Sequence, residues 1–219
     1  MGRSGSAVKS KTTSGFREAS RPRARRLAPE VRRELLLDCA IRVFAREGVA
    51  MAGHLDVAKE AGVSLSTVFV YFPTRRALRE AVFESMARWA LEMATAAHRS
   101  GKPPREALYD HLARITELIE AKLEYARIWL EWSMATEDEL WDRYRALQNR
   151  VFGMIKDTIR AGQRDGSIRA DLAPEDGAIA LVSAAYGIAQ SKAAGRTRAE
   201  LQRFARTVLD SVLPDGSPR

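Results

Sequence analysis

Residues 47–86 read EGVAMAGHLDVAKEAGVSLSTVFVYFPTRRALREAVFESM, and this stretch decides the fold. Its middle predicts two short helices joined by a tight turn at residues 61–64, AGVS. The glycine of that turn suits a helix C-terminus, and its serine can cap the helix that follows. Pro73 ends the second helix, because the residue before a proline avoids helical backbone angles. Thr74 can then cap a third, longer helix, which completes a helix-turn-helix unit.

The second helix of this unit has an outer face suited to a DNA major groove. Leu65 and Val68 fall three apart, so at least one of them can pack on the preceding helix. Small hydroxyls, a valine and a tyrosine remain for the outer face and suit contacts to base edges and phosphates. Arg75 and Arg76 lie in the first turn of the third helix, where the dipole disfavours cations, which predicts an anionic partner. The expected DNA contacts of this unit are Ser64, Leu65, Ser66, Thr67, Val70, Tyr71, Thr74 and Arg75.

The positive charge of the chain is concentrated at its N-terminus. The formal net charge is +8, and residues 1–29 alone hold eight Lys/Arg against one acid. This segment is rich in Ser, Gly and Thr, which predicts disorder over residues 1–28, and residues 1–15 also fit a solubilising leader. The run RPRARR at 21–26 directly precedes the first helix, where an N-terminal arm can follow the minor groove. The expected contacts of this arm are Arg21, Arg23, Arg25 and Arg26.

Composition and helix signals predict an all-α protein of about nine helices. Apolar residues make up 46% of the 219 residues, and no run alternates long enough to indicate a sheet. The first helix is expected from Pro29 to Glu47, closed by Gly48. Two capping boxes are predicted, Thr136 with Glu139 and Thr197 with Glu200. The expected apolar faces are Val31, Leu35, Leu36, Cys39, Ala40, Val43 and Phe44 in the first helix and Leu55, Val57, Ala58 and Ala61 in the second.

Several classes of function are excluded by what the sequence lacks. It has no apolar run long enough for a signal peptide or a membrane span, which predicts a cytoplasmic protein without a membrane partner. The single cysteine, Cys39, allows no internal disulfide. Only three histidines occur, His54, His98 and His111, with no phosphate loop, metal-spaced cluster or Cys/His pair. We therefore expect no catalytic residue, metal site or cofactor.

The helix-turn-helix residues resemble the TetR family of transcriptional regulators. This resemblance is carried by Ala58, Ala61-Gly62-Val63-Ser64, Thr67, Tyr71-Phe72-Pro73-Thr74-Arg75 and Leu78. A wider similarity, from Arg21 to about residue 213, is to the LuxR/HapR/SmcR-type quorum-sensing master regulators within that family. Its carriers are RPRARRLAP at 21–29, VFAREG at 43–48, GHLDVA at 53–58, VSLSTVFVYFPTR at 63–75, IWLEWSMATEDELW at 128–141 and APED at 173–176.

The resemblance implies a sequence-specific DNA-binding regulator, a repressor or an activator, with a ligand cavity in its C-terminal body. The implied cavity residues are Ala90, Met93, Trp129, Gln148, Phe152, Ile155 and Ala185. Three of them, Ala90, Met93 and Phe152, differ from the close relatives, so the ligand need not be shared. Val70 stands where those relatives carry an asparagine, which predicts a different operator preference. Trp129 and Trp132 also fit plain core aromatics.

The same evidence predicts the domain organisation and the partners. Residues 1–28 are the arm, residues 29–85 the DNA-binding domain, and residues 86–215 the ligand-binding and dimerisation domain. Wide apolar coverage of the last two helices, together with a palindromic double-stranded operator, indicates a homodimer. The expected ligand is an apolar or amphipathic small molecule. A DNA-binding architectural factor that recruits a protein partner, with the same fold and no ligand, is the alternative.

Overall fold

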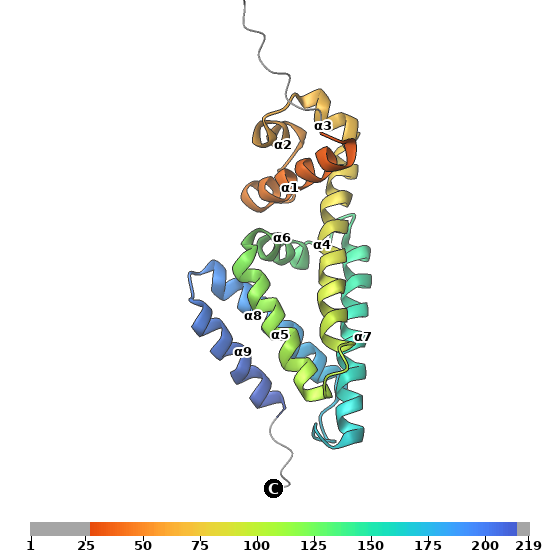
Figure 1. The fold of residues 1–219 in the computed structure, drawn as a ribbon, viewed down its shortest axis with the longest axis vertical. Coiled ribbons are helices and arrows are strands. Elements are labelled where there is room, and N and C mark those ends of the chain that lie inside the picture. Colours follow the sequence, from red (N-terminus) through yellow and green to blue (C-terminus); the bar gives the residue numbers. More distant parts are fainter. Residues whose placement is uncertain (1–26, 214–219) are drawn as a thin grey trace, which may run out of the picture.

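The computed structural model describes residues 27–213, and this range contains nine α-helices and no strand (Figure 1). The all-α prediction is therefore confirmed. The helices are α1 (Pro29–Glu47), α2 (His54–Ala61), α3 (Leu65–Tyr71), α4 (Arg75–His98), α5 (Pro104–Ala121), α6 (Leu123–Met134), α7 (Trp141–Asp165), α8 (Pro174–Ala193) and α9 (Arg198–Val212).

A small three-helix unit, α1 to α3, forms one end of a larger helical body (Figure 1). α4 starts beside α3 and runs into the body, where α7 lies along it. α5, α6 and α8 occupy the centre, and α9 packs on the outer side of α5 and α8. No helix within residues 27–213 is long and apolar enough to cross a membrane.

Local capping signals position the helices of the small unit. Gly62 ends α2 in the left-handed region, with φ 63°, as a helix C-terminus favours. The Ser64 hydroxyl accepts a hydrogen bond from the Thr67 amide at 3.2 Å and thereby starts α3. The Thr74 hydroxyl accepts one from the Ala77 amide at 3.0 Å and starts α4. The turn between α2 and α3 and the start of α4 are therefore set by neighbouring residues alone.

Of the two predicted capping boxes, the one at Thr197 and Glu200 is confirmed, whereas the one at Thr136 and Glu139 is wrong. α7 begins at Trp141, and no side chain caps it. Glu139 instead accepts a hydrogen bond from Arg79 of α4, at 3.2 Å. An ion pair between distant segments replaces the local cap at this position.

The predicted apolar stripes of the first two helices are partly wrong. Val31 and Leu35 are each 49% exposed, and Leu55 of α2 is 53% exposed. The other predicted residues of α1, Leu36, Cys39, Ala40, Val43 and Phe44, are buried as expected, and Leu37 and Ile41 are buried in addition. The reason is that α2, α4 and α6 all pack on α1, so its buried face is wider than the predicted stripe and begins one turn later.

Buried apolar residues form two clusters that do not follow the predicted domain boundary at residue 85. The first cluster joins α1, α2, α3 and the start of α4 to Trp132 of α6 and to Leu140 and Tyr144, at the start of α7. The second fills the space between α5, α7, α8 and α9. α4 itself runs unbroken across residue 85. The small unit thus shares its core with part of the body.

Candidate functional site

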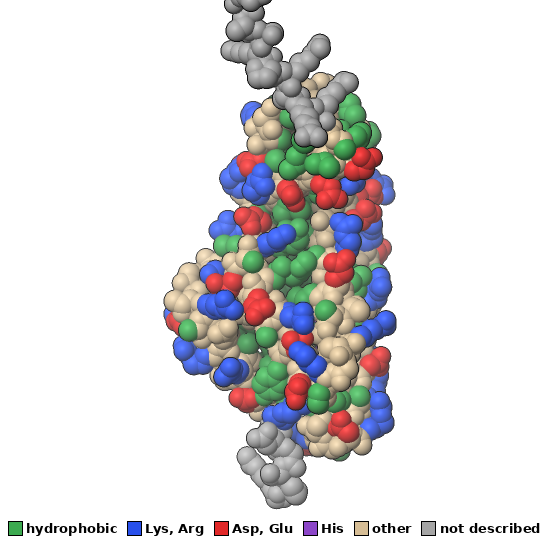
Figure 2. Space-filling view, viewed as in Figure 1, with side chains coloured by type: hydrophobic (Ala, Val, Ile, Leu, Met, Phe, Trp, Pro, Cys, Tyr) green, Lys and Arg blue, Asp and Glu red, His purple; other side chains and the backbone are tan. Residues whose placement is uncertain are grey.

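The outer face of α3 carries exposed side chains at the end of the molecule. Val70 is 75% exposed, Phe69 43% and Leu65 39%, whereas Val68 is fully buried against the rest of the unit. Hydrophobic side chains gather on this end, and acidic and basic side chains are scattered over the body (Figure 2). α3 is therefore held by one buried residue and offers most of its surface outward.

The hydroxyl groups predicted to contact DNA form a small network of their own. The Ser64 hydroxyl lies 2.9 Å from that of Ser66 and 2.8 Å from that of Thr67. All three residues lie at the N-terminus of α3, where backbone amides attract an anion. The network fixes the direction of these side chains before any partner binds.

His54 fixes the angle between α2 and α3, a role that the sequence did not indicate. Its Nε2 atom donates to the Phe72 carbonyl at 2.7 Å. Its ring stacks on that of Phe69, with the centroids 4.3 Å apart and the planes at 15°. His54 begins α2 and both partners belong to the end of α3, so one side chain ties the two helices together.

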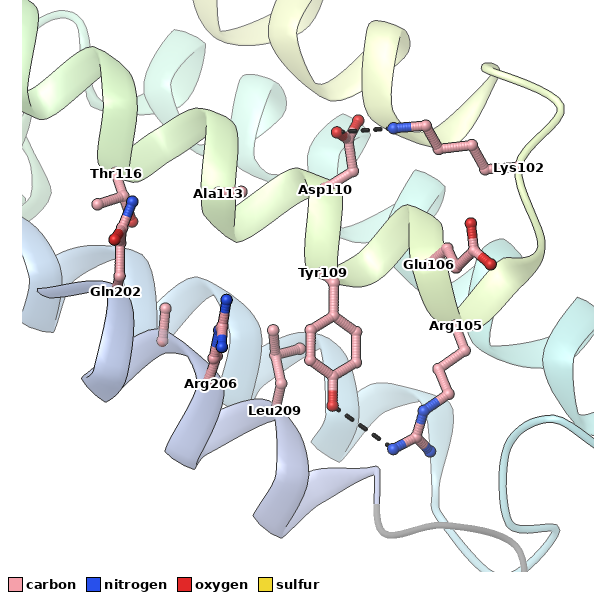
Figure 3. A pocket seen from close by; sticks show the side chains of 11 residues that line it. Lys102, Arg105, Glu106, Tyr109, Asp110, Ala113, Thr116, Gln202, Arg206 and Leu209 are labelled. Atoms are coloured by element: carbon pink, nitrogen blue, oxygen red, sulfur yellow. Dashed lines mark hydrogen bonds and ion pairs between the residues drawn. The ribbon is translucent and has the colours of Figure 1, made fainter. Parts of the chain in front are cut away.

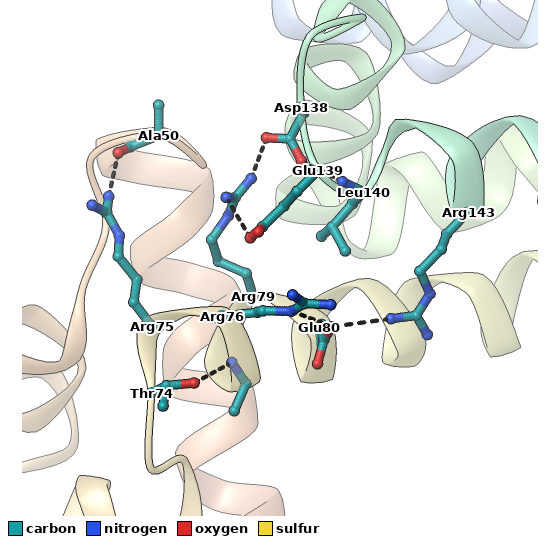
Figure 4. Close-up of polar contacts among 11 residues, drawn as sticks. Ala50, Thr74, Arg75, Arg76, Arg79, Glu80, Asp138, Glu139, Leu140 and Arg143 are labelled. Atoms are coloured by element: carbon teal, nitrogen blue, oxygen red, sulfur yellow. Dashed lines mark hydrogen bonds and ion pairs between the residues drawn. The ribbon is translucent and has the colours of Figure 1, made fainter.

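Arg75 and Arg76 differ in how their charges are compensated (Figure 4). Arg76 pairs with the Glu80 carboxylate at 3.0 Å. Arg75 donates to the Ala50 carbonyl, which is uncharged. A guanidinium has five N–H donors, so this bond orients Arg75 while leaving most of its donors and its charge available. The expectation that both arginines need an external anion is therefore wrong for Arg76.

The start of the described chain lies beside α3. A surface hollow of about 630 Å³ is lined by Leu27 and Ala28 together with residues of α1 and α3, among them Thr67, Val70 and Tyr71. The predicted arm contacts Arg21, Arg23, Arg25 and Arg26 lie outside the described residues. Leu27, which directly follows Arg26 in the sequence, nevertheless lies next to the candidate reading helix.

Two polar contacts bring α6 and the turn after it against the N-terminal half of the chain. The Val49 amide, two residues after the end of α1, donates to Glu131 of α6 at 2.8 Å. Arg79 of α4 binds Asp138 and Glu139, which lie between α6 and α7 (Figure 4). Both contacts engage α6 or the turn directly after it. A shift of α6 would therefore reach the segment between α1 and α2.

A cavity of about 80 Å³ lies inside the body, between α4, α5, α6, α7 and α8. Of the seven predicted cavity residues, Ala90, Met93, Trp129, Gln148 and Ala185 line it. Phe152 lines a surface groove instead, and Ile155 is fully buried in the core. The remaining lining residues are Met86, Trp89, His111, Ile115, Leu118, Ile119, Tyr125, Ala126, Val151, Val182, Tyr186 and Ala189.

Polar groups meet this cavity at two places. On the α7 side, the Gln148 amide nitrogen donates to the Tyr144 hydroxyl at 2.6 Å and also to Tyr186. Burial raises the pKa of both tyrosines, so both stay neutral phenols. On the α5 side stands His111, which is 2% exposed. The importance of His111 was missed, because a lone histidine on an apolar helix face gives no signal of its own.

His111 is paired with a second, partly buried histidine, His98 of α4. Nδ1 of His111 lies 3.0 Å from Nε2 of His98, whose Nδ1 lies 2.9 Å from the Thr158 hydroxyl. Burial lowers the pKa of His98 to about 4 and that of His111 to about 3, with a further lowering of the latter from His98. Asp110 opposes this lowering of the pKa only weakly, and both rings are therefore neutral at pH 7.

The groove between α5 and α9, about 520 Å³, is polar and differs from the interior cavity (Figure 3). Its side chains bind one another: Lys102 pairs with Asp110 at 2.9 Å, and Tyr109 bonds to Asp210 of α9. Arg105 also reaches the Tyr109 hydroxyl, at 3.5 Å. Of these bonds, the one between Tyr109 and Asp210 joins α5 to α9. No group of three or more His, Cys, Asp or Glu side chains within residues 27–213 is arranged to hold a metal ion.

α8 and α9 leave apolar side chains on their outer surface. Ile179 is 54% exposed and Phe204 40%. The Phe204 ring packs so closely on Gly187 that a Cβ atom there would lie 3.1 Å from it. Ala185, on the same helix as Ile179, points to the interior cavity instead. The two faces of α8 therefore serve different contacts.

A helix-turn-helix unit at the end of an all-helical body defines the class of DNA-binding regulators, and comparison with known proteins places the chain within it. Residues 36–82 match the family described as bacterial regulatory proteins, tetR family. The chain is 31% identical to the HTH-type transcriptional regulator LuxR of Vibrio harveyi over 196 residues, covering 89% of this chain and 94% of LuxR. The chain belongs to the TetR family and is a transcriptional regulator, not an enzyme.

Solved structures share the fold at lower identity. The ketosteroid transcriptional regulator KstR2 of Mycobacterium tuberculosis has a TM-score of 0.72 and 18% identity, covering 84% of this chain and 96% of KstR2. The transcriptional regulator FadR of Bacillus subtilis, solved in complex with stearoyl-CoA, has a TM-score of 0.69 and 17% identity, covering 84% of this chain and 99% of FadR. These likenesses support the fold alone.

Proposed function

We propose that this regulator binds a palindromic DNA operator as a homodimer and reads each half-site with α3. The observation that carries this proposal is the state of α3, whose ends are fixed by Ser64 and His54 while its outer face stays exposed. A pre-ordered helix with an exposed face at one end of the molecule is suited to enter a major groove.

Within this interface, we assign positioning and reading to different residues. Arg75 and Tyr71 contact phosphates, together with the arm arginines, and fix the register of the protein on the duplex. Ser66, Thr67 and Val70 face base edges. Val70 can touch only a thymine methyl or exclude water, so it favours A·T pairs at its position. Ser64, Leu65 and Thr74 support the helix from its ends.

Mobility-shift titrations on randomised duplexes test this division. Tyr71→Phe, which removes only the hydroxyl, should weaken binding to all sequences by a similar factor. Val70→Thr, which keeps the shape and adds a hydroxyl, should alter the selected sequence and leave the average affinity nearly unchanged. Unchanged affinity and unchanged preference in both variants would exclude α3 as the reading helix.

The dimer contact is assigned to α8 and α9. Ile179 and Phe204 are large apolar side chains left exposed on these helices, and a pair of helices that meets its twin forms a four-helix isologous interface. An operator of two inverted half-sites requires such symmetry.

The cavity is assigned to a small apolar or amphipathic ligand that regulates DNA binding. Its walls are mainly apolar, with polar groups at two places, as is usual for ligand sites. About 80 Å³ is small, but Met86 and Met93 are flexible side chains that can move to enlarge it. That FadR of the same fold was solved with stearoyl-CoA supports a ligand within such a body. The cavity itself favours this function over an architectural factor with a solid interior.

A further inference from the structure

The buried histidine pair determines which hydrogen-bonding groups the cavity can accept, and this inference rests on the proposed ligand function of the cavity. The starting point is Thr158 of α7. Its hydroxyl donates to the Met154 carbonyl one turn earlier, at 3.0 Å. A hydroxyl has only one hydrogen, and we assign it to this bond, so that toward His98 the Thr158 oxygen acts as an acceptor.

The direction of each following bond is then set. Nδ1 of His98 must carry the hydrogen that it donates to Thr158 at 2.9 Å. A neutral imidazole has one N–H and one lone pair, so Nε2 of His98 is an acceptor. The donor to that atom is Nδ1 of His111, at 3.0 Å. The hydrogen of His111 is thereby placed on Nδ1, and its Nε2 atom keeps a lone pair.

His111 brings this lone pair to the cavity. The residue is 2% exposed and lines the cavity from α5. Its Nδ1 atom is occupied by His98, so Nε2 is the ring nitrogen left to meet a further partner. Both rings are neutral because they are buried, in agreement with the lowered pKa of each.

We infer that Nε2 of His111 is a fixed hydrogen-bond acceptor for the cavity ligand, and that the ligand is an uncharged, largely apolar molecule bearing a hydroxyl or N–H group. The hydrogen of such a group can bond to the lone pair on Nε2 of His111. A ketone or a carboxylate instead sets its own lone pairs against that of His111 and leaves both unsatisfied. The relay from Met154 through Thr158 and His98 prevents His111 from reversing its hydrogen to suit such a ligand.

The tautomers can be observed directly, because the full chain has only three histidines. Long-range ¹H–¹⁵N NMR spectra of protein labelled with ¹⁵N-histidine distinguish Nδ1–H from Nε2–H rings. We expect His98 and His111 as Nδ1–H forms, and His54, which donates from Nε2 to the Phe72 carbonyl, as the Nε2–H form. His54→Gln assigns the His54 signals without touching the cavity. An Nε2–H form of His111 at pH 7 overturns the inference.

Ligand preference is tested with pyrrole and furan, rings of nearly equal size of which only pyrrole has an N–H donor. Pyrrole should bind roughly tenfold or more tightly than furan, the effect of one buried acceptor left unpaired, and should shift the Nε2 resonance of His111. Equal binding of the two rings overturns the assignment of His111 while leaving the cavity a ligand site. If neither ring binds, the cavity admits no ligand and the proposed ligand function fails as well.

A matched pair of variants isolates the relay. Thr158→Val removes the acceptor that orients His98, so His111 should become a mixture of tautomers and the preference for pyrrole should fall severalfold. Thr207→Val removes an equivalent hydroxyl, bonded to the Arg203 carbonyl at 3.0 Å on the exposed side of α9, and should change neither. An unchanged tautomer and preference in Thr158→Val contradict the relay.

Discussion

The α3 end of the molecule and the cavity in its body differ in how their polar groups are hydrogen-bonded. At the α3 end, the hydroxyls of Ser64, Ser66 and Thr67 bind one another, and His54 is bonded within the chain. In the body, His111 lines the cavity with its Nδ1 atom bonded to His98, which leaves Nε2 as its remaining polar atom. The hydroxyls of the α3 end are therefore bonded within the chain, whereas the cavity keeps a polar atom for a small molecule.

This difference suggests that DNA binding and the response to a ligand depend on different parts of the chain. A pre-ordered α3 can supply sequence preference, but residues 30–219 carry little net positive charge, because residues 1–29 hold eight Lys/Arg against one acid. Attraction to DNA must therefore come largely from the arm. The cavity, by contrast, can respond to a ligand only if that ligand binds the DNA-free and DNA-bound arrangements with different affinities.

The largest effect is expected from neutralising the arm. Replacing Arg21, Arg23, Arg25 and Arg26 by Gln should lower operator affinity about a thousandfold near 0.1 M salt, and the log-log salt slope should fall by roughly 0.9 for each phosphate that is no longer neutralised. Filter binding over a series of salt concentrations measures both quantities. Deletion of residues 1–20 removes the other four Lys/Arg of this segment together with Glu18, and it should change the slope less, because these residues lie farther from α3 in the sequence. An equal slope in the Gln variant would mean that α3 and Arg75 supply the charge themselves.

The next largest effect is expected from placing a charge on the exposed face of α9, which we assign to the dimer contact. Phe204→Arg should weaken dimerisation by about 3 kcal/mol or more, because the interface would then bury an unpaired charge, and operator binding should fall with it. Sedimentation measures the dimer, and circular dichroism checks the fold. Ser183 lies one turn from Ile179 on the exposed side of α8. Ser183→Glu should weaken the dimer in the same way if α8 belongs to the interface. A Phe204→Arg protein that stays dimeric places the interface elsewhere.

Acid should destabilise the body through its buried histidines. Both folded pKa values, about 4 for His98 and about 3 for His111, lie below the ordinary 6.5, so the unfolded state binds more protons below that pH. Their stabilising contribution is present above pH 6.5 and is lost as the pH falls, at roughly 1 kcal/mol per pH unit for each histidine. Urea unfolding between pH 7 and 5 measures the slope.

A double variant is the control for this pH dependence. A His98→Phe, His111→Phe protein should lose most of the slope, because both titrating rings are removed. A wild-type stability that is flat from pH 7 to 5 would mean that the histidines are hydrated in the folded state and that the interior is more open than its burial suggests.

The sequence predicted the first region better than the second for a physical reason. Gly62, Ser64, Pro73 and Thr74 act on residues within one helical turn, so the bounds of α2, α3 and the start of α4 follow from local rules. His54 escaped notice because its partner, the Phe72 carbonyl, is 18 residues away. The helices of the reading unit could be predicted where their contacts join residues that are close together in the sequence.

The cavity depends on five helices and was predicted only through the family resemblance. Five of the seven residues line the cavity, whereas Phe152 lines a surface groove and Ile155 lies in the core, because the rotation of α7 is set by its packing on α4, α5 and α8. Which of them contact a ligand stays a prediction. Contacts between distant segments also explain why the predicted capping box at Thr136 was wrong. Arg79, which lies on α4, donates a hydrogen bond to Glu139. The His98–His111 pair joins residues on two helices and could not be seen in either alone.

Filling the cavity should stabilise the body and remove its response to ligand. Ala185 lines the cavity from α8, and Ala185→Leu adds apolar volume where there is now a void. We expect a gain of about 1 kcal/mol in the free energy of unfolding, measured by urea titration, together with loss of pyrrole binding. Operator affinity should stay within about twofold, because α3 is untouched. A loss of stability instead would mean that the cavity is too rigid to take the side chain.

The smallest expected effect concerns the contact that joins the two regions. Glu131 of α6 lies two residues after Trp129, which lines the cavity, and accepts the Val49 amide at 2.8 Å. Glu131→Ala removes this acceptor and should cost about 1 kcal/mol of stability, with little change in operator affinity when no ligand is present. Glu131→Gln keeps an amide oxygen for Val49 and should behave nearly as wild type.

The same two variants test whether α6 couples ligand binding to DNA binding. If it does, the effect of a cavity ligand on operator affinity should shrink in Glu131→Ala and persist in Glu131→Gln. Fluorescence anisotropy with labelled operator measures this effect. An equal ligand effect in both variants would assign the coupling to α4, through Arg79 and its bonds to Asp138 and Glu139.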